Sequence, residues 1–356
     1  MRVSIWRQDV DLRFALDAAH QRHDQRSRLF LQVQRDGVDG FGEIAPQPAA
    51  LNGDPSVEEV IAELRDFVVP MLESIEGREG ALPSWTRVAR FAGPRAASNP
   101  AVALVEMALA DHELRRTNVA ATSVWPALYD TPRQATVSAI DESDEWPVEL
   151  GVARLRVKTT STPPQAWALE RLARVTAPVV LDFNCSALSD EDVMHQARVV
   201  GDVCDLVAVE QPYAAGNVVD HARLASQLGV AISVDEGIRS LRDIAQLARY
   251  GAAQIVCVKP SRVGGLANAR TIIAAANDAG LRPYIGGFFE SPFARRVNAM
   301  LARSCVVEPS DLDVVEVRGH TYDHETDQVA DGLGWRPCAT MLAHCEVVLT
   351  SHGAAI

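Results

Sequence analysis

The sequence predicts an α/β protein in which a smaller α+β domain precedes a parallel (β/α) barrel of the TIM type. From residue 134 onward, short apolar segments typical of strands alternate with amphipathic segments typical of helices, at a spacing that favours a barrel. No glycine-rich fingerprint follows the first of these strands, as it often does in an open doubly wound sheet. The first 120 residues or so instead place strand patterns before helix patterns, which indicates a separate α+β unit.

Length and composition agree with a two-part globular chain. The 356 residues are 47% hydrophobic and 23% charged, and the formal net charge is -13. An acidic chain is poorly suited to binding a phosphate backbone, and no apolar run is long enough to span a bilayer. Asp9 and Asp11 interrupt the N-terminal segment where a signal peptide would be apolar. We therefore expect a cytoplasmic protein with reduced cysteines that binds neither nucleic acid nor membrane.

The capping region, predicted over residues 1–125, begins with strands and continues with helices. Alternating segments at 28–35 and 41–45 flank the turn Asp36-Gly37, which indicates a hairpin or meander. Helical periodicity follows at 55–75 and at 100–116.

The barrel is predicted over residues 126–320, and residues 321–356 are expected to pack back on the first domain. Eight segments read as strands: 135–140, 152–158, 178–183, 205–210, 230–235, 253–259, 281–287 and a weaker 312–317. Helices are predicted between them at 189–200, 217–228, 239–249, 264–279 and 292–303.

Polar residues gather where these predicted strands end. They are Lys158, Asp182, Asn184, Glu210, Asp235, Glu236 and Lys259, followed by Gly287, Glu290 and Ser291 after the seventh strand. The carboxyl ends of barrel strands meet at one mouth, where this fold keeps its active sites. A single carboxylate there is often only a helix cap, but three on consecutive strands between two lysines are hard to explain in that way.

Three carboxylates brought together at that mouth would repel one another unless a cation lay between them. Asp182, Glu210 and Asp235 supply only oxygen ligands, which Mg²⁺ (or Mn²⁺) prefers over zinc. The sequence therefore predicts a divalent metal site that holds a substrate carboxylate.

The lysines point to proton chemistry. Only two of the 34 basic residues are lysine, Lys158 and Lys259, and both end apolar runs. Arginine can replace lysine as a solvated charge but cannot give up its proton near neutral pH. Arg156 shares the inward face of its strand with Lys158 and adds a cation that lowers the pKa of that lysine. Together these residues indicate removal of a proton next to a carboxylate.

An ordered set of motifs carries a resemblance to a known family. The set comprises GFGEIAPQP at 40–48, RVK at 156–158, DFN at 182–184, EQP at 210–212, DE at 235–236, KPSRVGG at 259–265, GGFFES at 286–291 and PSDLD at 309–313. In this order they resemble the enolase superfamily, in its muconate-lactonizing subgroup. The resemblance implies a modified (β/α)7β barrel with an N-terminal capping domain. It also implies Mg²⁺ on Asp182, Glu210 and Asp235, with Lys158 and Lys259 as the acid/base pair.

Within the subgroup, KPSRVGG followed by GGFFESPFARRVNAMLA is most similar to o-succinylbenzoate synthases and N-succinylamino acid racemases. The first implies syn dehydration of 2-succinyl-6-hydroxy-2,4-cyclohexadiene-1-carboxylate, a step of menaquinone synthesis. The alternatives are a racemase or a dipeptide epimerase and, in another class, a catalytically silent binding protein. Arg156 stands where the family more often has lysine, which keeps the charge but excludes an acid/base role for this residue.

The capping region is expected to complete the substrate pocket through loops 15–27 and 46–54. Arg22, His23 and Arg26 are candidates for contacting a distal carboxylate of the substrate, and Arg26 is the one selected. The barrel is expected to contribute further substrate contacts, namely Asn184, Glu236, Gly287, Glu290 and Ser291. The predicted partner is thus a small-molecule carboxylate, and the sequence leaves open whether the protein forms a homo-oligomer.

Overall fold

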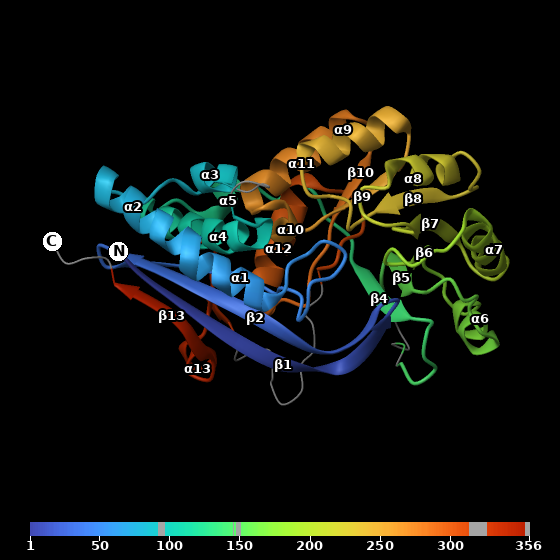
Figure 1. Ribbon diagram of the computed structural model, residues 1–356, viewed down its shortest axis with the longest axis horizontal. Helices are drawn as coiled ribbons and strands as arrows, with labels where there is room; N and C mark the ends of the chain where they lie inside the picture. Colours follow the sequence, from blue (N-terminus) through green and yellow to red (C-terminus); the bar gives the residue numbers. More distant parts are fainter. Residues whose placement is uncertain (92–96, 145, 147–150, 313–325, 353–356) are drawn as a thin grey trace.

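The computed structural model describes residues 1–91, 97–144, 146, 151–312 and 326–352. An antiparallel sheet with helices against it occupies one end, and a curled parallel sheet surrounded by helices occupies the other (Figure 1). The predicted α/β class, with a barrel-type parallel sheet and an N-terminal capping part, is confirmed.

The capping sheet is built around one long hairpin. Its order is β13-β1-β2-β3, and its strands are β1 (Arg2–Ala18), β2 (Gln21–Arg35), β3 (Val38–Ile44) and β13 (Glu346–His352). The hairpin of β1 and β2 extends until its tip lies beside β4 of the parallel sheet (Figure 1). At the tip, the backbone N–H of Asp17 donates to Asp144 Oδ2 over 3.2 Å. The C-terminal strand β13 pairs with β1 and so adds an outer strand to this sheet.

Helices cover one face of the capping sheet. They are α1 (Val57–Glu63), α2 (Val69–Glu79), α3 (Trp85–Val88), α4 (Asn99–Thr117) and α5 (Ala121–Val124). Ser56 begins α1 with a capping box to Glu59. A π-helical turn, Leu64–Val68, joins α1 to α2 just before Pro70, which has no N–H to donate to the preceding turn.

Helix α4 is the core of the contact between the two parts of the molecule. Most of its side chains are buried, and it packs against β3 on one side and α10 (Pro260–Val263) on the other. The approach to β3 is very close, because a Cβ at Gly42 would lie 2.2 Å from the carbonyl oxygen of Leu104. Glycine at this position therefore allows the helix to approach the sheet.

The parallel sheet contains seven strands in chain order. They are β4 (Gln134–Ser138), β5 (Arg154–Lys158), β6 (Val179–Asp182), β7 (Leu206–Glu210), β8 (Ala231–Val234), β9 (Ile255–Val258) and β10 (Arg282–Ile285). The helices between and after them are α6 (Ala166–Leu172), α7 (Asp190–Gly201), α8 (Val218–Ala225), α9 (Leu241–Tyr250), α11 (Leu266–Asp278) and α12 (Pro292–Cys305). A short β11 (Thr326–Gln328), β12 (Trp335–Pro337) and α13 (Ala339–Leu342) precede β13.

Residues Ser310 and Asp311 connect the two edges of this sheet. The N–H of Ser310 donates to Pro132 O, the N–H of Gln134 donates to Ser310 O, and the N–H of Asp311 donates to Ile285 O. The segment therefore bonds to the β4 edge and to the β10 edge at once. The eighth strand predicted at 312–317 lies, apart from Leu312, outside the described residues.

Two buried carboxylates of the capping part hold helices of the barrel. Glu43 accepts from the N–H and hydroxyl of Ser291 at the start of α12, and Glu106 accepts from the N–H groups of Leu266 and Ala267 at the start of α11. Burial raises the pKa of Glu43 to about 7 and that of Glu106 to about 8. These contacts fix the capping part against the loops that follow β9 and β10.

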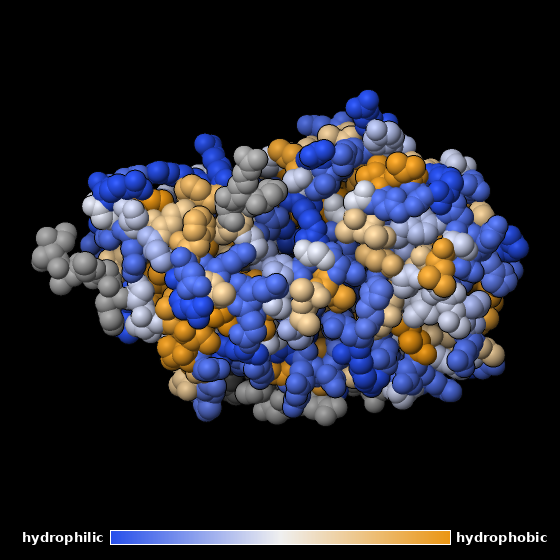
Figure 2. All heavy atoms as spheres, in the orientation of Figure 1, coloured by the Kyte–Doolittle hydropathy of each residue, from blue (hydrophilic) through white to orange (hydrophobic). Residues whose placement is uncertain are grey.

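Hydrophilic side chains cover most of the face shown in Figure 2, with hydrophobic ones scattered among them. Within the described ranges, no helix combines the length and the apolar character needed to cross a membrane.

Candidate active site

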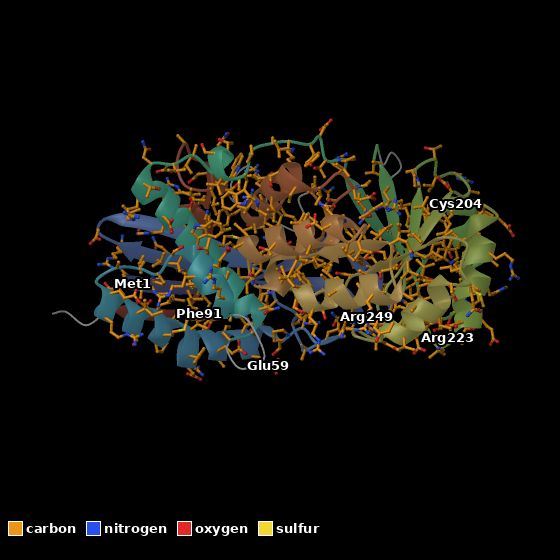
Figure 3. All side chains as sticks on the ribbon, turned by 90° about the horizontal axis from the view of Figure 1, so that it is seen from above. Met1, Glu59, Phe91, Cys204, Arg223 and Arg249 are labelled. Atoms are coloured by element: carbon orange, nitrogen blue, oxygen red, sulfur yellow. The ribbon has the colours of Figure 1, made fainter. Side chains whose placement is uncertain are left out.

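A cavity of about 620 Å³ lies between the capping part and the carboxyl ends of the barrel strands. Seen from above, the capping part with Met1, Glu59 and Phe91 is at one end of the molecule, and the barrel helices with Arg223 and Arg249 are at the other (Figure 3). The two walls differ in origin. The barrel wall comes from strand ends, and the capping wall comes from the β1–β2 hairpin and the loop 46–54.

Both lysines of the chain line this cavity. Lys158 is the last residue of β5 and Lys259 follows β9, so three strands of the sheet separate them. Both are nearly buried, with 8% and 7% of their surface exposed. The barrel therefore places two amino groups at separate points of one pocket.

The first carboxylate pairs with Lys158. Lys158 Nζ donates to Asp182 Oδ2 at 2.5 Å and to Asn184 Oδ1 at 2.8 Å. Asp182 is fully buried at the end of β6, and its Oδ1 accepts from the backbone N–H of Asn184.

The second carboxylate is Glu210 at the end of β7, and it forms an ion pair with Arg156. Arg156 donates to Glu210 Oε1 at 3.2 Å, and Tyr284 and Ser233 donate to Glu210 Oε2. Burial and then the charge of Asp182 raise the pKa of Glu210 to about 7. Negative charge is therefore crowded at this point of the strand ends.

The guanidinium of Arg156 is hydrogen-bonded to several side chains of the protein. Besides Glu210, its guanidinium donates to Thr136, to Tyr284 and, at 2.7 Å, to Asp311 Oδ2. It thus connects strands on both sides of β5. The predicted effect of Arg156 on Lys158 stays a prediction, and the hydrogen bonds of Arg156 give it a role in orienting Glu210.

The third carboxylate pairs with Lys259. Asp235 Oδ2 accepts from Lys259 Nζ at 2.8 Å, and its Oδ1 accepts from Arg262. Burial opposes ionisation, but the two cations outweigh it and hold the pKa of Asp235 well below its usual range. Burial also lowers the pKa of Lys259, yet the charge of Asp235 raises it overall.

Two further polar residues join the strand ends. Asn184 Nδ2 donates to Glu236 Oε1 at 3.0 Å. Among the described residues, Glu236 Oε2 is buried without a hydrogen-bond partner, and burial raises the pKa of this carboxyl. Both residues line the cavity, as predicted substrate contacts should.

The capping wall carries Arg26 and His23. Arg26 is 1% exposed, and its guanidinium donates to Gln47 Oε1 and to the carbonyl oxygens of Ala45, Pro46 and Phe288. Burial lowers the pKa of Arg26 to about 10. The His23 ring lies 5.4 Å from that of Phe289, and burial followed by the charge of Arg26 lowers the pKa of His23 to about 3. His23 is therefore neutral at physiological pH.

Arg22 lies farther out, at the hairpin tip. It pairs with Asp17 and lies 3.6 Å from Asp144 Oδ1, so it fastens the hairpin to the loop after β4. It is not among the cavity-lining residues.

The predicted contacts after β10 divide into two groups. Gly287 lines the cavity, whereas Glu290 and Ser291 lie behind its wall. Glu290 accepts from the N–H of Phe288 and pairs with Arg295, and Ser291 is bonded to Glu43. Neither side chain reaches the cavity, because Ser291 caps α12 and the side chains of both residues are bonded within the loop and to Glu43.

Sequence reasoning did not select Arg262, Asp54 or Tyr284. Arg262 bridges Asp235 and Asp54, the last residue of the loop 46–54, with an Nη2–Oδ2 distance of 2.8 Å to Asp54. It lies in the KPSRVGG motif, three residues after Lys259. Residues at this spacing on a helix lie side by side, so the sequence could have indicated that Arg262 lies near Lys259. Tyr284 offered no such signal, because its position inside a strand predicts a core side chain.

The donor set fits a divalent cation in chemistry. Asp182, Glu210 and Asp235 are buried, and burial, followed by the charge of Asp182, raises the pKa of Glu210. Among the described residues, Glu236 Oε2 has no hydrogen-bond partner, and carboxylate oxygens are the ligands that a hard divalent cation prefers. Within the described ranges, no three acidic, histidine or cysteine side chains converge as a metal-binding group. Each carboxylate is instead bonded to a cationic side chain of the protein.

Comparisons with known proteins identify the family to which the chain belongs. The family described as enolase C-terminal domain-like matches residues 139–335, more than half of the chain. The chain belongs to the enolase superfamily. Enzymes of this superfamily generally use Mg²⁺.

Several relatives of this superfamily member carry the names of enzymes. The o-succinylbenzoate synthase of Bacillus subtilis is 26% identical over 313 residues, covering 85% of this chain and 81% of the relative. The N-succinylamino acid racemase of Amycolatopsis is 28% identical over 287 residues, 78% of this chain and 76% of the relative. The structure of the N-succinyl Arg/Lys racemase from Bacillus cereus matches with a TM-score of 0.79 at 17% identity, covering 99% and 98% of the two chains.

Proposed function

We propose that this superfamily member is a Mg²⁺-dependent enzyme that removes the proton next to the carboxylate of a small-molecule substrate. The observation that carries the proposal is the placement of the only two lysines of the chain. Both are buried in one cavity, and each is bonded to a different predicted metal ligand. A scaffold or binding protein has no need of two such groups where arginine serves for every other positive charge.

We assign different roles in this reaction to different residues of the chain. Asp182, Glu210 and Asp235 would hold the metal, and Arg156, Tyr284 and Ser233 orient Glu210. A bound Mg²⁺ would hold the substrate carboxylate and stabilise the negative charge that develops there. Lys158 takes the α-proton, and Lys259 faces the substrate from the other side of the pocket. Burial of both amino groups excludes bulk water from the proton transfer.

The finer activity we propose is o-succinylbenzoate synthase, a syn dehydration. Support comes from several relatives with this name, including one from Geobacillus kaustophilus that is 31% identical over 283 residues. In this reaction Lys158 takes the α-proton and returns it to the departing hydroxyl, while Lys259 remains cationic. Arg26 on the opposite wall is suited to an anionic end of the substrate, because it is a buried guanidinium with no carboxylate bonded to it among the described residues.

A second candidate is racemisation of N-succinylamino acids. Three strands lie between Lys158 and Lys259, so the two amino groups can reach both faces of a substrate carbon. Removal of the proton on one face and return on the other requires both lysines as titrating groups.

One experiment tests the proposal and separates the candidates. The purified protein is incubated with Mg²⁺ in D₂O, once with the cyclohexadiene carboxylate and once with each enantiomer of N-succinylphenylglycine. Dehydratase activity gives the aromatic product, and racemase activity gives deuterium at the α-carbon of both enantiomers. Absence of product and of exchange in all three reactions, with folded protein, contradicts the proposed function.

A further inference from the structure

Asn184 forms hydrogen bonds with residues of both the barrel and the capping part. It follows β6 with φ 44°, a left-handed conformation that asparagine tolerates better than most residues. Its side-chain oxygen accepts from Lys158 Nζ at 2.8 Å, and its side-chain nitrogen donates to Glu236 at 3.0 Å. Its N–H donates to Asp182. Three of its polar groups are therefore committed to the residues around Lys158.

The carbonyl oxygen of Asn184 is held by the capping part. His20, in the turn between β1 and β2, donates from Nε2 over 2.7 Å. Asn52, in the loop 46–54, donates from Nδ2 over 3.4 Å and also lies 3.5 Å from Glu236 Oε1. Two segments far apart in the sequence thus converge on one carbonyl group of the barrel.

The loop 46–54 is itself fastened at this point. Arg239 donates to the carbonyl oxygens of Asn52 and Gly53 at 2.8 and 2.9 Å. The side chain of Asn52 is thereby held over Asn184, so its contact with the barrel is part of a fixed arrangement rather than a chance approach.

The two lysines differ in this respect. Lys158 has Asn184 as its second hydrogen-bond acceptor, and Asn184 is what His20 and Asn52 hold. Lys259 has Asp235 as its acceptor, and its ammonium lies 4.4 Å from the ring centroid of Phe288. Among the described residues, the hydrogen bond from His20 at the hairpin tip is therefore connected through Asn184 to Lys158, and not to Lys259.

We propose that His20 and Asn52 are positioning residues that orient Lys158 through Asn184. With both contacts made, the backbone of Asn184 stays in its left-handed conformation and its amide oxygen fixes the direction of the Lys158 ammonium. Without them, Asn184 is held by Asp182 and Glu236 alone, so its backbone can shift and its amide oxygen holds the Lys158 ammonium less firmly. The inference rests on the proposed function only in taking Lys158 as the group that removes the proton.

The lysine content of the chain supplies a direct test. Because Lys158 and Lys259 are the only lysines, protein labelled with [ε-¹³C]lysine gives two side-chain signals by NMR, assigned with Lys259→Arg. We expect His20→Ala and Asn52→Ala to shift or broaden the Lys158 signal and to leave the Lys259 signal in place. His20→Gln, which retains a donor, should restore much of the native signal.

Gln25→Ala is the matched control. Gln25 is exposed on the same hairpin, and its side-chain amide donates to Asp11 on the neighbouring strand, so neither lysine signal should change. An unchanged Lys158 signal in both the His20 and Asn52 variants overturns the inference, and so does an equal change of both lysine signals.

Kinetics give the second readout. With a substrate that the wild-type protein converts, His20→Ala should lower kcat about 3- to 10-fold with little change in KM, because orientation of the base matters only in the transition state. A rise in KM at constant kcat contradicts a positioning role. If the wild-type protein converts no candidate substrate, the proposed function fails while the NMR result still decides the positioning inference.

Discussion

The two walls of the cavity are built in different ways. On the barrel wall, each functional group is the last residue of a strand or follows it directly, and cations and carboxylates neutralise one another in pairs. On the capping wall, His23 is neutral. Arg26 donates to a side-chain amide oxygen and to backbone carbonyl oxygens, and no carboxylate is bonded to it among the described residues. The difference supports the proposal that the barrel wall carries out the proton transfer and that the capping wall selects the substrate.

The largest effects are expected on the barrel wall, from the two lysines. Lys158→Arg keeps the positive charge and removes the titrating amine, so activity should fall by about 10²- to 10⁴-fold. In a dehydratase, Lys259→Arg should retain some elimination, since that residue need only remain cationic. Initial rates of aromatic product formation check this asymmetry.

Equal and complete loss of elimination in both variants, with fold and Mg²⁺ binding intact, would show that the two lysines do not differ in role. In a racemase both variants should lose racemisation, and each should retain at most exchange of one enantiomer's α-proton.

A further large effect on the same wall is expected at Glu210, first of all on the binding of Mg²⁺. Glu210→Gln removes one charge from the metal site and places an amide group opposite the donors of Arg156 and Tyr284. Mg²⁺ affinity should fall by more than about 10-fold, with loss of turnover. Calorimetric titration with Mg²⁺ measures the affinity directly, and retention of wild-type affinity would exclude Glu210 as a ligand.

The barrel wall could be predicted from the sequence because strand ends repeat at regular intervals. Lys158, Asp182, Glu210, Asp235 and Lys259 follow one another at 24, 28, 25 and 24 residues, and parallel strands bring such positions to one mouth. These residues do lie at strand ends. Lys158 and Lys259 line the cavity, whereas Asp182, Glu210 and Asp235 are buried and are not among the lining residues. The fold class was predictable for the same reason.

The capping wall could not be predicted in the same detail, because its geometry depends on contacts between distant segments. The strand at Arg2–Ala18 was not recognised, although it brings Asp17 to Asp144. Likewise, no periodicity reveals that Ser291 would be bonded to Glu43, or that Arg262 would bridge Asp54 and Asp235. Such pairings are set by tertiary packing, which a single sequence does not encode in any local pattern.

On the capping wall, Arg26→Met tests substrate selection. If Arg26 contacts an anionic end of the substrate, KM should rise about tenfold or more with a smaller change in kcat, since a charge-assisted hydrogen bond contributes about 1.5–3 kcal/mol. Arg28→Met is the matched control, because Arg28 is equally buried on the same strand but does not line the cavity. Both variants should lose stability, and a KM that rises equally in both would remove the special role of Arg26.

The smallest effect concerns the neutral His23. Burial lowers the pKa of His23 from its ordinary value of 6.5 to about 3 in the folded protein, so between these two pH values the unfolded chain binds a proton that the folded protein does not. The stability that depends on neutral His23 is therefore complete above pH 6.5 and decreases as the pH falls toward 3. Between pH 7 and pH 6 the free energy of unfolding should fall by about 0.7 kcal/mol from this group. Urea unfolding of the wild type and of His23→Gln, whose amide does not titrate, measures the difference. The same slope in the wild type and in His23→Gln would show that His23 is not buried in neutral form.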